Sequence, residues 1–143
     1  MTTLTFRNIE VHPDDPVSEW GLEGIQTALE RGNIAHWRRL AHAVRENPWG
    51  PVSRDLETVL TYSHPYGVAD LMDRVIVTAR SAREVQERAE VAAQVRELIA
   101  ASGLSKKEFA ASIGTSRSRL STYANGSVIP SAALMVRMHR VSH

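Results

Sequence analysis

The sequence predicts an all-α protein built from two helical modules. Apolar residues recur every three or four positions through most of the 143 residues, which is the spacing of an amphipathic helix. Glycines and prolines separate these periodic segments, and no long alternating pattern typical of a β-strand appears. A hydrophobic fraction of 43% suits a folded chain rather than a disordered one. We therefore expect helices packed on helices without a sheet.

The charges are unevenly distributed along the chain. The formal net charge is +1, but residues 1–90 contain an excess of acids and residues 91–143 an excess of Lys and Arg. Such a split indicates two modules, the basic one being a candidate for nucleic-acid binding. We expect a helical module over residues 1–80, a helical connector over 81–90 and a second domain over 91–143.

Composition argues against several classes of function. The absence of cysteine excludes disulfides, thiolate chemistry and Cys-type zinc sites. The six histidines are scattered, and His36 and His42 would lie on different sides of a helix, so we predict no metal site and no cofactor. No catalytic triad, glycine-rich phosphate loop or carboxylate pair stands out, so we predict no enzyme. The N-terminal segment lacks a signal core and no apolar stretch could span a membrane, which predicts a cytoplasmic protein without a membrane partner.

The first module begins with irregular chain over residues 1–15, followed by three predicted helices. The first helix is expected over about 18–30 and ends at Gly32. The second covers 34–47, with Asn33 as its cap and Pro48 as its stop. The third follows Pro51, a residue that the first turn of a helix tolerates.

The elements that join the two modules are also predicted to be helical. A fourth helix is expected over 68–80. The charged segment 81–103 then forms either one long helix or two helices broken near residue 90, and Gly103 ends it.

The aromatic residues are concentrated in the first module. All three tryptophans and two of the three tyrosines lie between Trp20 and Tyr66. We interpret them as core residues, with a binding surface as the alternative because aromatics are enriched at interfaces. Trp49 lies in an Asn-Pro-Trp-Gly-Pro turn and is the member expected to be exposed.

Residues 104–131 contain the most informative pattern. Ser105 and Glu108 match a capping box, and Gly114 is placed for the left-handed conformation that ends a helix sharply. Ser116 can cap a second short helix, which Asn125 and Gly126 end. Two short helices joined by a tight glycine turn form a helix-turn-helix unit, whose second helix fits the DNA major groove. The apolar residues of the pair are predicted to be core: Phe109, Ile113, Leu120 and Tyr123.

The outward side chains of this segment suit a polyanionic partner. Residues 117–122 contain no acid, and from Ser105 to the last residue six Lys or Arg accompany a single acid, Glu108. Excess positive charge provides the salt-dependent phosphate attraction that dominates DNA affinity.

Over about residues 91–141 the chain resembles the Cro/lambda-repressor-like helix-turn-helix family, often called the XRE family. The matching elements stand at the family's spacing: Leu104-Ser105, Phe109-Ala110, Ile113-Gly114-Thr115-Ser116, Leu120, Tyr123, Asn125-Gly126 and Pro130-Ser131. The family usually has five helices; here 91–102 would be the first and 131–143 the fourth. The chain is expected to be too short for a full fifth, so the acidic module or a partner chain would cover the apolar surface left open.

The resemblance implies which residues contact DNA. Arg117 and Ser118 match residues that usually meet base edges, Thr122 matches one that often reaches a base, and Arg119 would reach a base or a phosphate. Lys106 replaces the family's usual glutamine, which makes a phosphate contact the better expectation, and Asn125 matches a phosphate-binding residue. The predicted DNA-binding residues are Lys106, Lys107, Ser116, Arg117, Ser118, Arg119, Ser121, Thr122 and Asn125.

These features together predict a sequence-specific, double-stranded DNA-binding transcriptional regulator. Repression by a homodimer on a near-palindromic operator is the simplest expectation and rests on the habit of the family. Residues 1–80 would dimerise, sense a ligand or bind a protein. Two alternatives remain open: an antitoxin that represses its own operon and neutralises a toxin through residues 1–80, and a protein-interaction adaptor that does not bind DNA.

Overall fold

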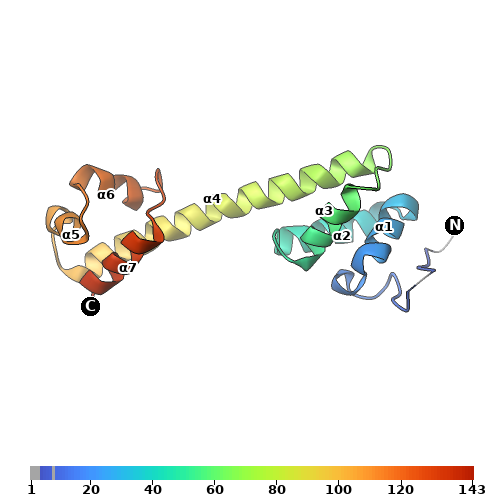
Figure 1. The fold of residues 1–143 in the computed structure, drawn as a ribbon, viewed down its shortest axis with the longest axis horizontal. Helices are drawn as coiled ribbons and strands as arrows, with labels where there is room; N and C mark the ends of the chain where they lie inside the picture. The colour runs from blue at the N-terminus through green and yellow to red at the C-terminus, as the bar shows by residue number, and fades with distance from the viewer. Residues whose placement is uncertain (1–3, 8) are drawn as a thin grey trace. The chain divides into compact units, whose positions relative to one another are not determined.

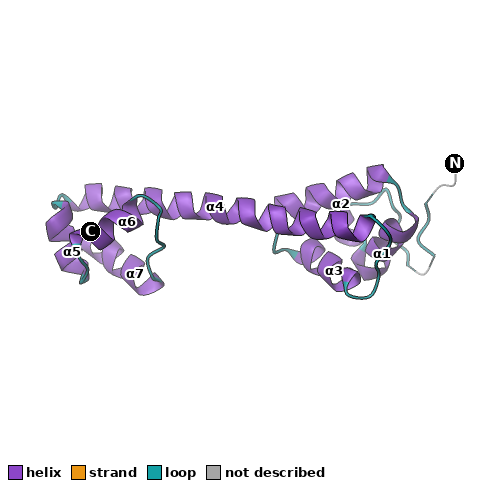
Figure 2. Cartoon of the chain, turned by 90° about the horizontal axis from the view of Figure 1, so that it is seen from above, coloured by secondary structure: helices purple, strands orange, loops and turns teal. Residues whose placement is uncertain are grey.

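The computed structural model describes residues 4–7 and 9–143, and this part of the chain folds into helices without any strand (Figures 1 and 2). The all-α prediction is therefore confirmed. The chain divides into two compact units, Met1–Arg83 and Glu84–His143. In chain order the elements are a 3-10 helix η1 (Val17–Glu19), α1 (Gly21–Arg31), α2 (Ile34–Glu46), α3 (Pro51–Leu60), α4 (Val68–Ser102), α5 (Lys106–Ile113), α6 (Arg117–Ala124) and α7 (Ala132–Val141).

The first helix differs from its predicted extent. The sequence predicts a single helix over 18–30, whereas η1 ends before Trp20 and α1 begins at Gly21. Gly21 has a φ of 65°, a left-handed conformation that interrupts a right-handed helix. The predicted stop at Gly32 and the predicted cap at Asn33 are confirmed, since the Asn33 side chain accepts a hydrogen bond from the backbone N–H of Ala35.

The core of the first unit is formed by helices α1 to α3, the N-terminal part of α4 and the segment before η1. Trp20 is 1% exposed; its indole N–H donates to the carbonyl of Asp15 at 3.2 Å. The ring of Phe6 meets the Trp20 ring edge-on, and Gly24 lets both approach the backbone of α1. The largest fully buried side chains of this unit are Trp20, Ile25, Leu29, Leu40, Leu56 and Met72.

Three aromatic residues of the first unit are at the surface. Trp20 is buried and Trp37 packs partly buried against the same core, as expected. Tyr62 and Tyr66, however, are 52% and 103% exposed, so the core interpretation is wrong for them. Both lie in the turn between α3 and α4, where connecting segments run over the surface. Trp49 is exposed, as its turn predicted.

Helix α3 is tied to α4 by an ion pair on the surface of the first unit. The Arg80 guanidinium donates to the carboxylate of Glu57, at 2.9 Å for Nη1, and to the carbonyl of Pro48 at 2.9 Å. The hydrogen bond from Arg80, reinforced by its positive charge, holds the pKa of Glu57 below its usual value. The same guanidinium lies 5.9 Å from the centre of the Trp49 ring.

Helix α4 is continuous through the segment where a boundary was expected. The prediction of a fourth helix ending at Arg80 is wrong, as is the alternative of a break near residue 90, because α4 runs unbroken for 35 residues. Residues 68–102 contain no glycine or proline and are rich in Ala, Arg and Glu, all good helix formers. Despite this length, no helix in the described part of the chain is long and apolar enough to cross a membrane.

The second unit is formed by α5, α6 and α7 packed around the C-terminal part of α4 (Figure 1). The residues predicted as core in the helix pair are confirmed: Phe109 and Ile113 are fully buried, Leu120 is 1% exposed and Tyr123 is 6% exposed. Val95 and Ile99 of α4 and Met138 of α7 complete this core. The two short helices α5 and α6 are thus held on a support of two flanking helices.

Candidate nucleic-acid interface

Helix α5 begins with the predicted capping box. The Ser105 hydroxyl accepts a hydrogen bond from the N–H of Glu108 at 3.1 Å, and the Glu108 carboxylate accepts one from the N–H of Ser105 at 3.3 Å. The hydrogen bond with the Ser105 side chain holds the pKa of Glu108 below its usual value. The single acid of the C-terminal basic stretch is therefore used to start α5, and Lys106 and Lys107 project into solvent beside it.

The turn between α5 and α6 has the predicted geometry. Gly114 has a φ of 79°, and the N–H of Thr115 donates back to the carbonyl of Ala110 at 2.9 Å, which closes α5. The Ser116 hydroxyl then accepts from the N–H of Arg119 at 3.1 Å and caps α6. The chain thereby ends one helix and begins the next within three residues.

Helix α6 has one buried face and one exposed face. Leu120 and Tyr123 point into the core, whereas Arg117, Ser118, Arg119 and Ser121 are exposed. The first turn contains no acid. Because a helix N-terminus has partial positive charge, the arginines and the helix dipole make this end of α6 attractive to anions. In the described part of the chain the side chains of Arg117, Ser118 and Ser121 make no hydrogen bond.

Thr122 and Asn125 are partly engaged within the protein. The Thr122 hydroxyl donates to the carbonyl of Arg119 at 2.6 Å, so its remaining capacity is to accept a hydrogen bond or to offer its methyl group. The Asn125 side-chain oxygen accepts from the N–H of Ser127 at 2.8 Å. The Asn125 amide NH₂ group remains available to donate to a phosphate.

The structure places the predicted DNA-binding residues on three successive segments. Lys106 and Lys107 stand at the start of α5, residues 116–122 begin and form α6, and Asn125 lies in the loop that follows. All of them are exposed except Thr122, which is half-buried. These three segments belong to a single compact unit.

Sequence reasoning missed two arginines that contact the ends of the helix pair. Arg96 of α4 donates from Nη1 to the carbonyl of Ala124 at 2.6 Å, and Arg137 of α7 donates from Nη1 to the carbonyl of Ile113 at 3.2 Å. Ala124 and Ile113 are the last residues of α6 and α5. One signal was available: neither α5 nor α6 has a basic residue in its own last turn. The sequence does not reveal which distant cation takes that place.

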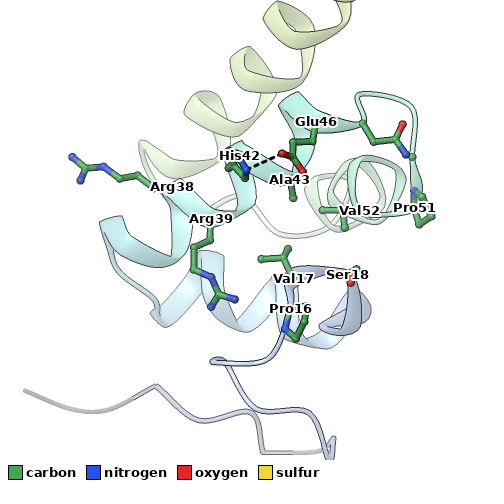
Figure 3. A pocket seen from close by; sticks show the side chains of 12 residues that line it. Pro16, Val17, Ser18, Arg38, Arg39, His42, Ala43, Glu46, Pro51 and Val52 are labelled. Carbon is green, nitrogen blue, oxygen red and sulfur yellow. Dashed lines mark ion pairs between the residues drawn. The ribbon is translucent and has the colours of Figure 1, made fainter.

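The first unit contains a cavity of about 590 Å³ between η1, α2 and the start of α3 (Figure 3). Val17, Ala43 and Val52 contribute apolar surface, and His42 and Glu46 pair at 3.1 Å on α2. The Arg39 guanidinium is engaged elsewhere, since it donates to the carbonyls of Pro13 and Asp15 and lies over the Trp20 ring. Figure 3 shows Arg38 pointing away from Val17 and Val52. The cavity therefore has a mainly apolar lining, and the charged side chains around it pair with other protein groups or point away from it.

Two histidines of α2 have local roles in the structure. His36 accepts a hydrogen bond from the N–H of Asn33 at 3.1 Å and completes the cap of α2, while His42 pairs with Glu46. Among residues 4–7 and 9–143, no group of three or more His, Asp or Glu is arranged to hold a metal ion.

A short exposed helix without acids, placed by a tight glycine turn on a buried support, has the geometry of a helix-turn-helix domain, the class of fold that many DNA-binding regulators use. In agreement, residues 95–141 match the family model described as helix-turn-helix, which confirms the XRE-type resemblance over those residues. This is a family of DNA-binding regulator domains rather than of enzymes. Comparison with the curated proteins and with the solved structures found no significant match.

Proposed function

We propose that this protein is a transcriptional regulator that reads double-stranded DNA by inserting α6 into the major groove. The observation that carries the proposal is the exposed face of α6, where Arg117, Ser118 and Ser121 are free of internal hydrogen bonds in the described residues and no acid accompanies them. In this proposal residues 91–143 bind DNA, residues 81–90 connect the two parts, and residues 1–80 serve a second role.

The side chains divide into those that read bases and those that position the domain. Arg117 begins α6, and its guanidinium can donate two hydrogen bonds to a guanine, a contact worth about 1–3 kcal/mol of discrimination. Ser118 and Ser121 offer hydroxyls to neighbouring bases. Lys106, Lys107 and the NH₂ group of Asn125 contact phosphates, which fix the register but carry no sequence information.

The proposed active form is a homodimer that represses transcription. One domain of this size reads few base pairs, so two copies on half-sites about 34 Å apart would supply the needed selectivity. The second unit has exposed apolar residues, among them Val128, Ile129 and Val136, that a second copy could cover. A dimer bound at a promoter represses most simply by blocking polymerase.

Selection from a pool of random-sequence duplexes tests the proposal directly. We expect the full-length protein to enrich a short motif with dyad symmetry. Its affinity for duplex DNA should fall steeply between about 50 and 200 mM salt, because salt weakens the phosphate contacts. Light scattering of the protein on the selected duplex measures whether two copies bind. Weak binding without any enriched motif would contradict sequence-specific reading.

The variant Arg117→Ala tests the assignment of the base-reading residue. It should lower the preference for one base pair of the selected site by about 10- to 100-fold, since one bidentate contact is lost. Arg74→Ala is the matched control, because Arg74 is an exposed arginine of α4 in the first unit. If Arg117→Ala keeps the wild-type base preference, Arg117 does not read that base.

An antitoxin role is the second candidate for the whole chain. Exposed aromatic side chains of the first unit, Trp49, Tyr62 and Tyr66, favour a protein partner there. Coexpression with the product of a neighbouring small gene, followed by purification, tests this role. An adaptor that does not bind DNA is the remaining alternative. Enrichment of a motif in the duplex selection would contradict it, and absence of any DNA binding would support it.

A further inference from the structure

The geometry points to Arg96 and Arg137 as positioning residues that set the orientation of α6 for DNA reading. This inference rests on the proposed function. Each arginine belongs to a helix that flanks the helix-turn-helix pair, and each donates a hydrogen bond to the last carbonyl of one helix of the pair. Together they hold the C-terminal ends of both α5 and α6.

Arg96 attaches the end of α6 to α4. Its Nη1 atom lies 2.6 Å from the carbonyl oxygen of Ala124. The loop after α6 also runs close to α4, since a Cβ added at Gly126 would lie 3.6 Å from the Cβ of Ala92. The small side chain of Ala92, which is 3% exposed, therefore lets the loop that contains Asn125 approach α4 closely. The end of α6 is therefore bonded to α4, and the start of this loop lies near the same part of α4.

Arg137 attaches the end of α5 to α7. Its Nη1 atom donates to the carbonyl of Ile113 at 3.2 Å, and the same atom would lie 3.7 Å from a Cβ at Gly114. The hydrogen bond is therefore made at the last residue before the tight turn. Because this turn sets the angle between the two helices, a cation fixed here restrains the angle directly.

Electrostatics explains why both positions carry a cation. The carbonyls at a helix C-terminus are unpaired and partially negative, and a nearby cation stabilises them. Helices α5 and α6 have no basic residue in their own last turns, so α4 and α7 supply the charge. Arg96 and Arg137 therefore stabilise the C-terminal ends of the pair from the two flanking helices.

A positioning role has a different signature from a phosphate contact. Base reading requires side chains to be held within about 0.5 Å and 10–20° of their productive geometry, so loosening α6 lowers the preference for the correct sequence. Binding to any duplex depends on the number of phosphate contacts, and each contact removed reduces the salt slope by about one. Loss of a positioning residue should lower the preference for the correct sequence and leave the salt slope unchanged.

The experiment compares Arg96→Ala, Arg96→Lys, Arg137→Ala and Arg137→Lys in the full-length chain. The probes are a duplex carrying the motif that the wild-type protein selects and a scrambled duplex of equal length. We expect each alanine variant to reduce the ratio of the two affinities at least tenfold, without changing the salt slope on the scrambled duplex. Lysine at either position can still donate one hydrogen bond to the carbonyl and should recover most of the ratio.

Matched controls separate positioning from loss of folding. Arg140→Ala on α7 and Arg74→Ala on α4 remove exposed arginines for which no hydrogen-bond partner is found in the described residues, and they should leave the ratio unchanged. Circular dichroism at the binding temperature checks that each variant is folded. If an alanine variant unfolds, the lysine variant is compared with the wild type instead. Its ratio of affinities for the selected and the scrambled duplex should lie between that of the wild type and that of a non-specific binder.

Two results would overturn the inference. An alanine variant that is folded and keeps the wild-type ratio shows that α6 is oriented without the arginine. A salt slope that falls by about one shows a phosphate contact instead. Both differ from failure of the proposed function, in which the wild-type protein itself selects no motif.

Discussion

At the residue scale, one backbone conformation determines whether the helix pair can form. Gly114 has a φ of 79°, and Ser116, two residues later, caps α6. A residue with a Cβ in this conformation is strained by contact with its own backbone. This position was predictable from the sequence, because a glycine between two capped apolar patterns is typical of a left-handed helix end. The contact of Arg137 with the preceding residue was not, since it joins positions 24 residues apart.

We predict that Gly114→Ala lowers the free energy of unfolding of the second unit by about 1–2 kcal/mol, which is the cost of the left-handed conformation. Steric crowding is not the cause, since a Cβ added at Gly114 would lie 3.7 Å from Nη1 of Arg137, an ordinary van der Waals distance. Gly114→Asn should cost less, because asparagine adopts this conformation more readily than alanine. Urea unfolding measures both variants, and equal losses for alanine and asparagine would argue against backbone strain.

At the element scale, α5 and α6 depend on their ends more than on their length. Each has eight residues, too few for a stable helix alone. Their serine caps and glycine turn were visible in the sequence, so both helices were predictable almost to the residue. The unbroken course of α4 was less so. Residues 84–90 are all exposed, so no core on either side imposed an apolar period there, and the sequence left open whether the helix breaks.

We predict that Ser105→Ala destabilises the second unit by about 0.5–2 kcal/mol, because it removes the hydroxyl of the capping box at the start of α5. Ser112→Ala is the control. Ser112 is also an exposed serine of α5, but its hydroxyl donates to the carbonyl of Glu108 in the middle of the helix. Its replacement should change stability by less than about 0.5 kcal/mol. Amide hydrogen exchange within α5 and α6 reports on this unit separately, and similar losses for both serines would refute the cap assignment.

At the scale of the whole molecule, the chain contains two separate hydrophobic cores. The first contains residues such as Ile25, Leu40 and Leu56, and the second contains residues such as Phe109 and Leu120. The charge asymmetry anticipated two parts, and the helix-turn-helix pattern anticipated the second core in detail. The first core was harder to predict, because the aromatic residues of that unit divide between interior and surface: Trp20 is buried, whereas Trp49, Tyr62 and Tyr66 lie exposed in turns that periodicity does not describe.

We predict that thermal unfolding follows two transitions rather than one, because each unit has its own core. Leu56→Ala should lower the midpoint temperature of one transition and Leu120→Ala that of the other. Each substitution should reduce the unfolding free energy of its own unit by about 2–5 kcal/mol. Scanning calorimetry of the full-length variants measures both midpoints. A single transition that both substitutions shift equally would show that the two cores unfold as one.

The division of labour within α6 has an evolutionary consequence. Its inward residues and caps build the fold, whereas Arg117, Ser118 and Ser121 make no hydrogen bond within the described chain. Those three outward positions can therefore be exchanged at little energetic expense. Under the proposed function, a descendant of this protein can be retargeted to a new operator through a few substitutions on this exposed face, while the rest of the domain stays unaltered.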